Sequence, residues 1–87
     1  MPELPHISGN EAINVFERMG FKVVRQRGSH VVLRKDDRGC VIPLHKELAA
    51  GTLRSAIKQA GITDADFING YKNKITYHPN PLYTVDQ

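Results

Sequence analysis

Three β-rich runs that follow one another with short breaks limit the possible folds of this chain most strongly. The runs are FKVVRQR (21–27), SHVVLRK (29–35) and GCVIPLH (39–45). Parallel strands need a crossover of a dozen or more residues, so runs this close together predict antiparallel hairpins. Pro43 cannot donate a hydrogen bond to a ladder, which indicates that the third run lies at a sheet edge or ends there.

Segments with helical patterns precede and follow these three runs in the sequence. Ser8 and Glu11 have capping-box spacing, and Gly20 is placed to end a helix, so we expect a helix from about 9 to 19. The segment GTLRSAIKQAG (51–61) predicts a second helix. Its apolar stripe has the spacing i, i+3, i+4 and i+7 and consists of Leu53, Ala56, Ile57 and Ala60.

The last quarter of the chain predicts a short third helix and then an extension. Thr63 is a candidate cap, acidic residues follow it, and Phe67 is an apolar anchor. The remainder has no sustained period, so a brief strand at KITYH (74–78) and an irregular path over the surface both stay open. We therefore expect one domain over residues 1–69 and an extension of unclear structure over residues 70–87.

Helix, three antiparallel strands and helix make an α+β fold in which both helices bury their apolar stripes against one sheet face. The other face of the sheet stays open in this arrangement. Double-stranded-RNA-binding domains have the same order of elements, although order alone does not establish function.

The composition predicts a small cytoplasmic domain. A chain of 87 residues can bury one modest core, and its single cysteine rules out a disulfide framework. We read Cys40, in GCVIPL, as a small core residue. The start MPELPHISGNE resembles no signal peptide, and no apolar run approaches the roughly 20 residues of a membrane span. The four histidines lack metal-ligand spacing, so we expect no metal and no other cofactor.

Positive charge is concentrated around the first two β-rich runs. Between positions 22 and 38 the only acidic residues are Asp36 and Asp37. The same segment has six cationic residues: Lys22, Arg25, Arg27, Arg34, Lys35 and Arg38. Such a surface attracts polyanions, of which nucleic acid is the commonest. A pair of solvated strands gives the same pattern, so charge alone does not decide between the two.

One histidine stands among these charges. Side chains alternate across a strand, so His30 and Arg34 share a face, about 13 Å apart, while Val31 and Leu33 face the helices. Imidazole exchanges protons near neutral pH, which suits metal-free RNA cleavage, where a base removes the 2′-hydroxyl proton. A lone exposed histidine is more often incidental than catalytic, so these residues alone leave the question open.

The run GFKVVRQRGSHVVLRK, followed by VIPLHKELAAGTLRSAIKQAGITDADF, resembles the HicA (YcfA-like) family of toxins over residues 4 to about 68. The resemblance implies the double-stranded-RNA-binding arrangement and activity as an mRNA interferase, an endoribonuclease that cuts mRNA. It also implies a partner antitoxin of the HicB type that blocks the site. The family's catalytic histidine lies in its GSH signature, which here ends at His30, a general acid or base. A non-catalytic RNA-binding module of the same fold and a protein-interaction domain are the alternatives.

Further site residues are less sharply defined by the pattern. His45 also matches the family, either as a second proton-transfer group or as a cap at the strand-to-helix junction, and the usual behaviour of polar loop groups favours the cap. Thr52, at a helix start suited to phosphate, is either a ligand or a plain helix residue. Tyrosines in the extension either stack on bases or, as we favour, pack over the core edge. The candidate RNA contacts are Arg25, Arg27, Gly28, Ser29, Arg34, Lys35, Thr52, Arg54 and Lys58, although Arg54 and Lys58 equally suit a role in keeping their helix soluble.

Overall fold

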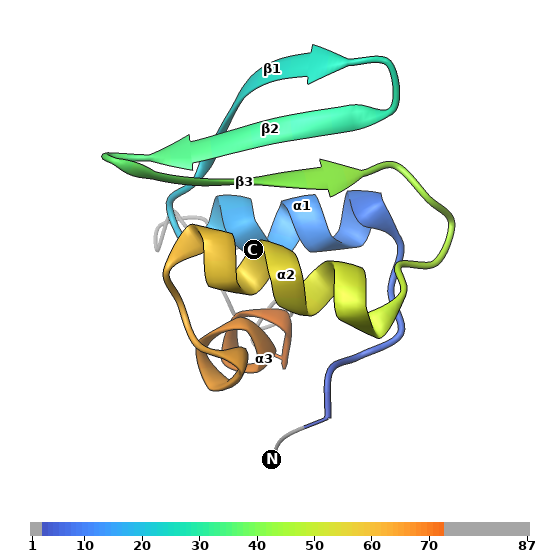
Figure 1. The fold of residues 1–87 in the computed structure, drawn as a ribbon. Coiled ribbons are helices and arrows are strands. Elements are labelled where there is room, and N and C mark those ends of the chain that lie inside the picture. The colour runs from blue at the N-terminus through green and yellow to red at the C-terminus, as the bar shows by residue number, and fades with distance from the viewer. Residues whose placement is uncertain (1–2, 73–87) are drawn as a thin grey trace, which may run out of the picture.

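The computed structural model describes residues 3–72 and confirms the α+β arrangement typical of double-stranded-RNA-binding domains (Figure 1). No helix in this part of the chain is long and apolar enough to span a membrane. The elements are α1 (Gly9–Arg18), β1 (Lys22–Arg27), β2 (His30–Lys35), β3 (Arg38–Pro43), α2 (Ala50–Ala60) and α3 (Asp64–Lys72).

The three strands form one antiparallel sheet in the order β1-β2-β3, so Pro43 does lie on an edge strand. Figure 1 shows α1 and α2 beneath the sheet and α3 on their far side. Val31 and Leu33 are buried and His30 and Arg34 exposed, as the alternation along β2 predicts. The side chains that alternate inward from β2 and β3 therefore build the core against the helices.

Strand β1 departs from the simple side-chain alternation of a regular strand. The pairing register with β2 shifts between Val23 and Arg25, which leaves Val24 as one extra residue. The bulge places Val23 on the face opposite to Arg25. All six residues of β1 are exposed, so the helices cover β2 and β3 rather than the whole sheet. A bulge on an exposed edge also hinders pairing with a further strand.

The predicted helix ends are present. Ser8 and Glu11 form a reciprocal capping box, with N–O distances of 2.9 and 3.1 Å. Thr63 and Asp66 exchange equivalent bonds of 3.1 and 3.0 Å before α3. Gly61 ends α2 with a φ of 74°, a left-handed conformation in which a side chain is strained. These local signals depend only on neighbours in the sequence, and the tertiary fold preserves them.

Helix α3 contributes one residue, Phe67, to the buried core. Phe67 has no exposed surface, and its ring lies 5.3 Å from that of Phe16 in α1. Arg18 donates two hydrogen bonds to the Gly70 carbonyl, at 3.0 and 3.3 Å. The helix continues past residue 69 as far as Lys72. The candidate strand at KITYH (74–78) lies outside the described residues.

Cys40 is buried, as expected for a core residue, and burial raises the pKa of its thiol to about 12. The ordinary value is 9.0, so the unfolded thiol ionises first as the pH rises, and the unfolded state gains stability. We expect about 1.4 kcal/mol of stability to be lost from this group between pH 8 and pH 10. Urea unfolding of wild type and Cys40→Ala at both pH values measures it. An equal loss in both proteins would contradict the assignment.

Candidate functional site

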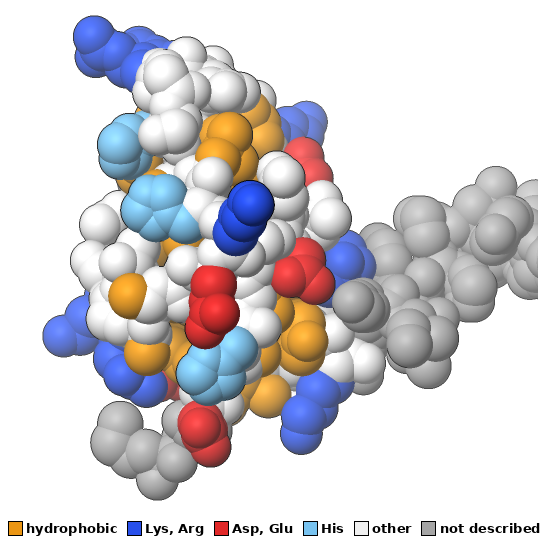
Figure 2. Space-filling view, turned by 90° about the vertical axis from the view of Figure 1, so that its right-hand side faces the viewer, with side chains coloured by type: hydrophobic (Ala, Val, Ile, Leu, Met, Phe, Trp, Pro, Cys, Tyr) orange, Lys and Arg blue, Asp and Glu red, His pale blue; other side chains and the backbone are white. Residues whose placement is uncertain are grey.

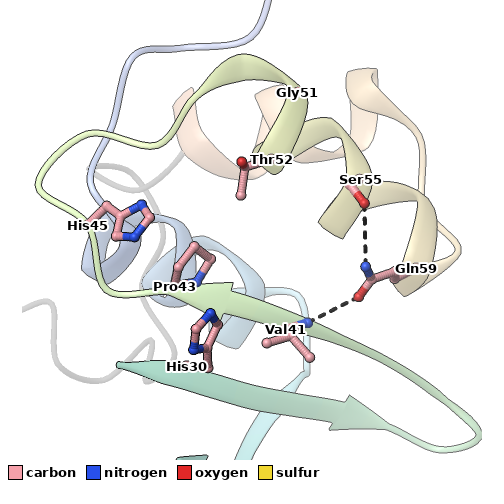
Figure 3. Close-up of a pocket in the computed structure, with 8 residues that line it drawn as sticks. All are labelled: His30, Val41, Pro43, His45, Gly51, Thr52, Ser55 and Gln59. Atoms are coloured by element: carbon pink, nitrogen blue, oxygen red, sulfur yellow. Dashed lines mark hydrogen bonds between the residues drawn. The ribbon is translucent and has the colours of Figure 1, made fainter. Parts of the chain in front are cut away.

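A groove of about 490 Å³ lies where β2 begins, β3 ends and α2 starts (Figure 3). One side of it is formed by the sheet and the loop after β3, and the other by a face of α2 that extends from Gly51 to Gln59. The lining residues are His30, Val41, Pro43, His45, Gly51, Thr52, Ser55 and Gln59.

His30 enters this groove because of its place in the ladder. It is the first residue of β2 and lies between Arg27 of β1 and Pro43 of β3. The inward turn of Val31 sends the preceding side chain to the opposite face, and His30 is exposed. The structure therefore places this imidazole at the open end of a rigid strand, where a solute can reach it.

His45 lines the same groove from the loop between β3 and α2 (Figure 3). Its carbonyl oxygen accepts a hydrogen bond of 2.9 Å from the Gly9 N–H, so the backbone of this loop is attached to the start of α1. The imidazole itself is exposed and makes no hydrogen bond to any residue in the range 3–72. The N-cap of α2 is Ala49, and no side chain caps it. The capping role favoured for the His45 side chain from the sequence is therefore wrong.

A polar stripe along α2 closes the other side of the groove. Thr52, Ser55 and Gln59 have the spacing i, i+3 and i+7 and so lie on one helix face. Gln59 accepts a 3.2 Å hydrogen bond from the Val41 N–H and donates one of 3.4 Å to Ser55 (Figure 3). The sequence analysis singled out only Thr52 of the three. The helical spacing of the polar residues was the signal that could have identified the other two.

Gln59 connects α2 to the edge of β3, which predicts a measurable structural role. Removing its amide leaves the Val41 N–H to solvent, and the helix loses its hydrogen bond to the strand. We expect Gln59→Ala to lower the free energy of unfolding by about 1 kcal/mol, the net worth of one such hydrogen bond. Urea unfolding measures the loss, and Lys58→Ala on an exposed flank of the same helix is the control. Equal stability of the two variants would contradict this role.

Three of the predicted cationic residues share the face of the sheet that carries His30, and two of them belong to β1. Arg27 is the cross-strand neighbour of His30, and Arg25 is the neighbour of Val32. Both side chains are exposed and have no hydrogen bond or ion pair with any residue of the described range 3–72. Arg34 also stands on this face, at the far end of β2 and outside the groove lining.

The turn before β2 carries the other two predicted residues of this region. Gly28 has a φ of 59°, and no atom lies within 4 Å of the position that its Cβ would take. The Ser29 carbonyl accepts a 2.7 Å hydrogen bond from the Leu44 N–H, which joins this turn to the end of β3. The turn is thus open on its outer side and anchored on its inner side.

Three predicted RNA contacts lie away from the groove. Lys35 points to the opposite face of the sheet and donates a 2.9 Å hydrogen bond to the Met19 carbonyl at the end of α1. Arg54 pairs with Asp64 of α3 at 3.2 Å. Lys58 lies one turn further along the same flank of α2 as Arg54, and neither residue lines the groove.

Figure 2 shows how histidine and charged side chains are distributed on this side of the molecule. Two histidine side chains lie side by side there, and Lys or Arg side chains project at the top of the view, over the β1–β2 hairpin. Within residues 3–72, no three His, Cys, Asp or Glu side chains gather as a metal ion would require. The groove thus offers imidazole, hydroxyl and amide groups with cations beside them.

A comparison with models of protein families shows to which family this chain is related. A family model described as the HicA toxin of bacterial toxin–antitoxin systems matches residues 9–62, well over half of the sequence. The chain belongs to the HicA toxin family. All eight residues that line the groove fall inside the match, whereas α3 follows it. No curated protein matches the chain.

Membership in the HicA family indicates the general role of this chain. Its members are the toxin components of bacterial toxin–antitoxin systems, so this chain is a toxin-type domain that functions beside an antitoxin. The predicted resemblance of the chain to the HicA family is thereby confirmed.

Proposed function

We infer that this HicA-family protein is an endoribonuclease that cleaves mRNA in the cytoplasm, with His30 as its general acid or base. The observation that carries the inference is the position of His30, exposed on a strand end and lining a groove. No carboxylate lines this groove, and its polar groups are imidazole, hydroxyl and amide. These groups move protons and hold phosphate, and the proposed cleavage therefore needs no metal ion.

The proposed reaction uses the 2′-hydroxyl of the RNA itself. Removal of its proton lets the oxygen attack the adjacent phosphorus, and the 5′-oxygen of the next nucleotide leaves. Proton transfer by a positioned imidazole contributes typically about 10²–10⁴-fold to the rate. Arg25 and Arg27, on the same face as His30, would attract the RNA and offset the negative charge that develops on phosphorus.

The start of α2 supports a place for the phosphate. No side chain caps this helix, and Gly51 and Thr52 of its first turn line the groove. Backbone N–H groups at a helix start favour anions. The proposed partner protein is an antitoxin of the HicB type, which would block cleavage by covering the groove that holds His30.

Purified protein incubated with mRNA in buffer that contains EDTA tests the proposal. We expect cleavage that continues without divalent cations and leaves fragments with a cyclic phosphate or monophosphate at the 3′ end and a hydroxyl at the 5′ end. Induced expression in bacteria should arrest growth and deplete transcripts. RNA that stays intact under every condition would contradict an endoribonuclease. Binding of that intact RNA would favour the alternative, a non-catalytic RNA-binding module.

A further inference from the structure

Two histidines share the groove, and the backbone holds them in a defined relation. His30 lies opposite Pro43 in the ladder between β2 and β3. The Leu44 N–H donates to the Ser29 carbonyl at 2.7 Å, so the residues that immediately precede the two histidines are joined by a hydrogen bond. Figure 3 shows Pro43 between His30 and His45. The two imidazoles therefore come from different elements but stand at one site.

The loop that carries His45 is held from a second side. Gly9 at the start of α1 donates to the His45 carbonyl, and a Cβ on this glycine would come within 2.1 Å of the Pro43 carbonyl oxygen. Helix α1 can approach the loop this closely only with glycine at position 9, and this contact holds the loop backbone in place. The His45 side chain contributes nothing to this contact, because only its carbonyl takes part. The fold therefore fixes the backbone that carries the His45 ring, and the ring itself takes no part in that contact.

The proposed cleavage requires two proton transfers at opposite sides of phosphorus. The attacking 2′-oxygen and the leaving 5′-oxygen lie in line in the transition state, so one group at a fixed position cannot reach both at the same moment. The groove supplies two imidazoles beside Pro43. We propose that His45 is a second catalytic residue, which gives a proton to the leaving 5′-oxygen while His30 takes the proton of the 2′-hydroxyl. This inference rests on the proposed ribonuclease function, which assigned His30 alone.

The step balances in atoms and electrons. The bond between the 2′-oxygen and phosphorus forms as His30 accepts the hydroxyl proton. The bond between phosphorus and the 5′-oxygen breaks, its electron pair stays on that oxygen, and protonated His45 neutralises the charge. The products are a 2′,3′-cyclic phosphate and a 5′-hydroxyl. His30 is left protonated and His45 neutral, and exchange with water restores both.

A change of leaving group separates a proton donor from a binding residue. Two oligoribonucleotides of one sequence are compared, one with the ordinary 5′-oxygen at the scissile position and one with a bridging 5′-sulfur, which leaves as thiolate without a proton. We expect His45→Ala to slow cleavage of the ordinary RNA about 100-fold or more and to cleave the sulfur substrate at nearly the wild-type rate. His30→Ala should be slow on both substrates, because the 2′-hydroxyl needs its base in each.

Two further variants serve as controls for the His45 experiment, and several outcomes would contradict the proposal. His45→Gln is a second substitution at this site, and His6→Ala removes an exposed histidine outside the groove and should match wild type on both substrates. An equal loss on the two substrates, no loss on either, or rescue of His30→Ala by sulfur would each overturn the donor role of His45 while leaving the ribonuclease in place. Wild type that cuts neither substrate would overturn the proposed function, and the donor role with it.

Discussion

Replacing His30 by alanine is expected to reduce RNA cleavage by about 10²–10⁴-fold, the usual contribution of a positioned general acid or base. The imidazole is exposed at the start of β2 and makes no hydrogen bond to any residue of the part described. Its removal therefore leaves the ladder, the core and the cationic face intact. RNA affinity should persist, because Arg25 and Arg27 remain. Rates from single-turnover cleavage and affinities from filter binding measure the two quantities separately.

The matched control for this prediction is a histidine elsewhere on the surface. His6 is exposed and faces Glu47 at 3.2 Å, outside the groove. Such an exposed pair is worth at most about 1 kcal/mol, so His6→Ala should cleave RNA like wild type. Melting temperatures of both variants exclude misfolding as the cause of lost activity. Equal cleavage by His30→Ala and wild type would remove His30 from the mechanism.

Replacing Phe67 by alanine is expected to lower the free energy of unfolding by about 3–5 kcal/mol, the typical cost of emptying a buried aromatic site. The ring is completely buried and packs on Phe16, although α3 lies beyond the residues that the family model matches. In a domain of this size each 1 kcal/mol corresponds to about 4–8 °C in melting temperature. The variant should therefore melt at least about 12 °C below wild type, as thermal unfolding followed by circular dichroism would measure.

An exposed apolar residue of the same domain supplies the comparison. Val24, 56 % exposed at the bulge of β1, has little packing to lose, so Val24→Ala should stay within about 0.5 kcal/mol of wild type. A melting temperature of Phe67→Ala near that of wild type would show that α3 is not needed for the stability of the domain. A loss of the expected size would show that α3 belongs to the folded domain, although the family model matches only as far as residue 62.

Much of the fold follows from short-range patterns. The capping box of Ser8, the glycine that ends α2 and the alternation along β2 each depend on a few neighbouring residues, and all three appear in the structure. The bulge at Val24 does not follow from such a pattern, because it depends on how two strands pair. The roles of Lys35 and Arg54 likewise depend on partners 16 and 10 residues away in the chain.

The sequence by itself determined the helix–sheet–helix order and the outward position of His30, because periodicity and capping are local properties of the chain. Its motifs separately carried the resemblance to the HicA family. Only the tertiary structure decided that His45, Thr52, Ser55 and Gln59 share a groove with His30. The reason is that three elements meet there, through the Leu44–Ser29 hydrogen bond and the contact of Gln59 with β3. Contacts between residues distant in the chain are set by packing of the whole domain, and no spacing along the sequence records them.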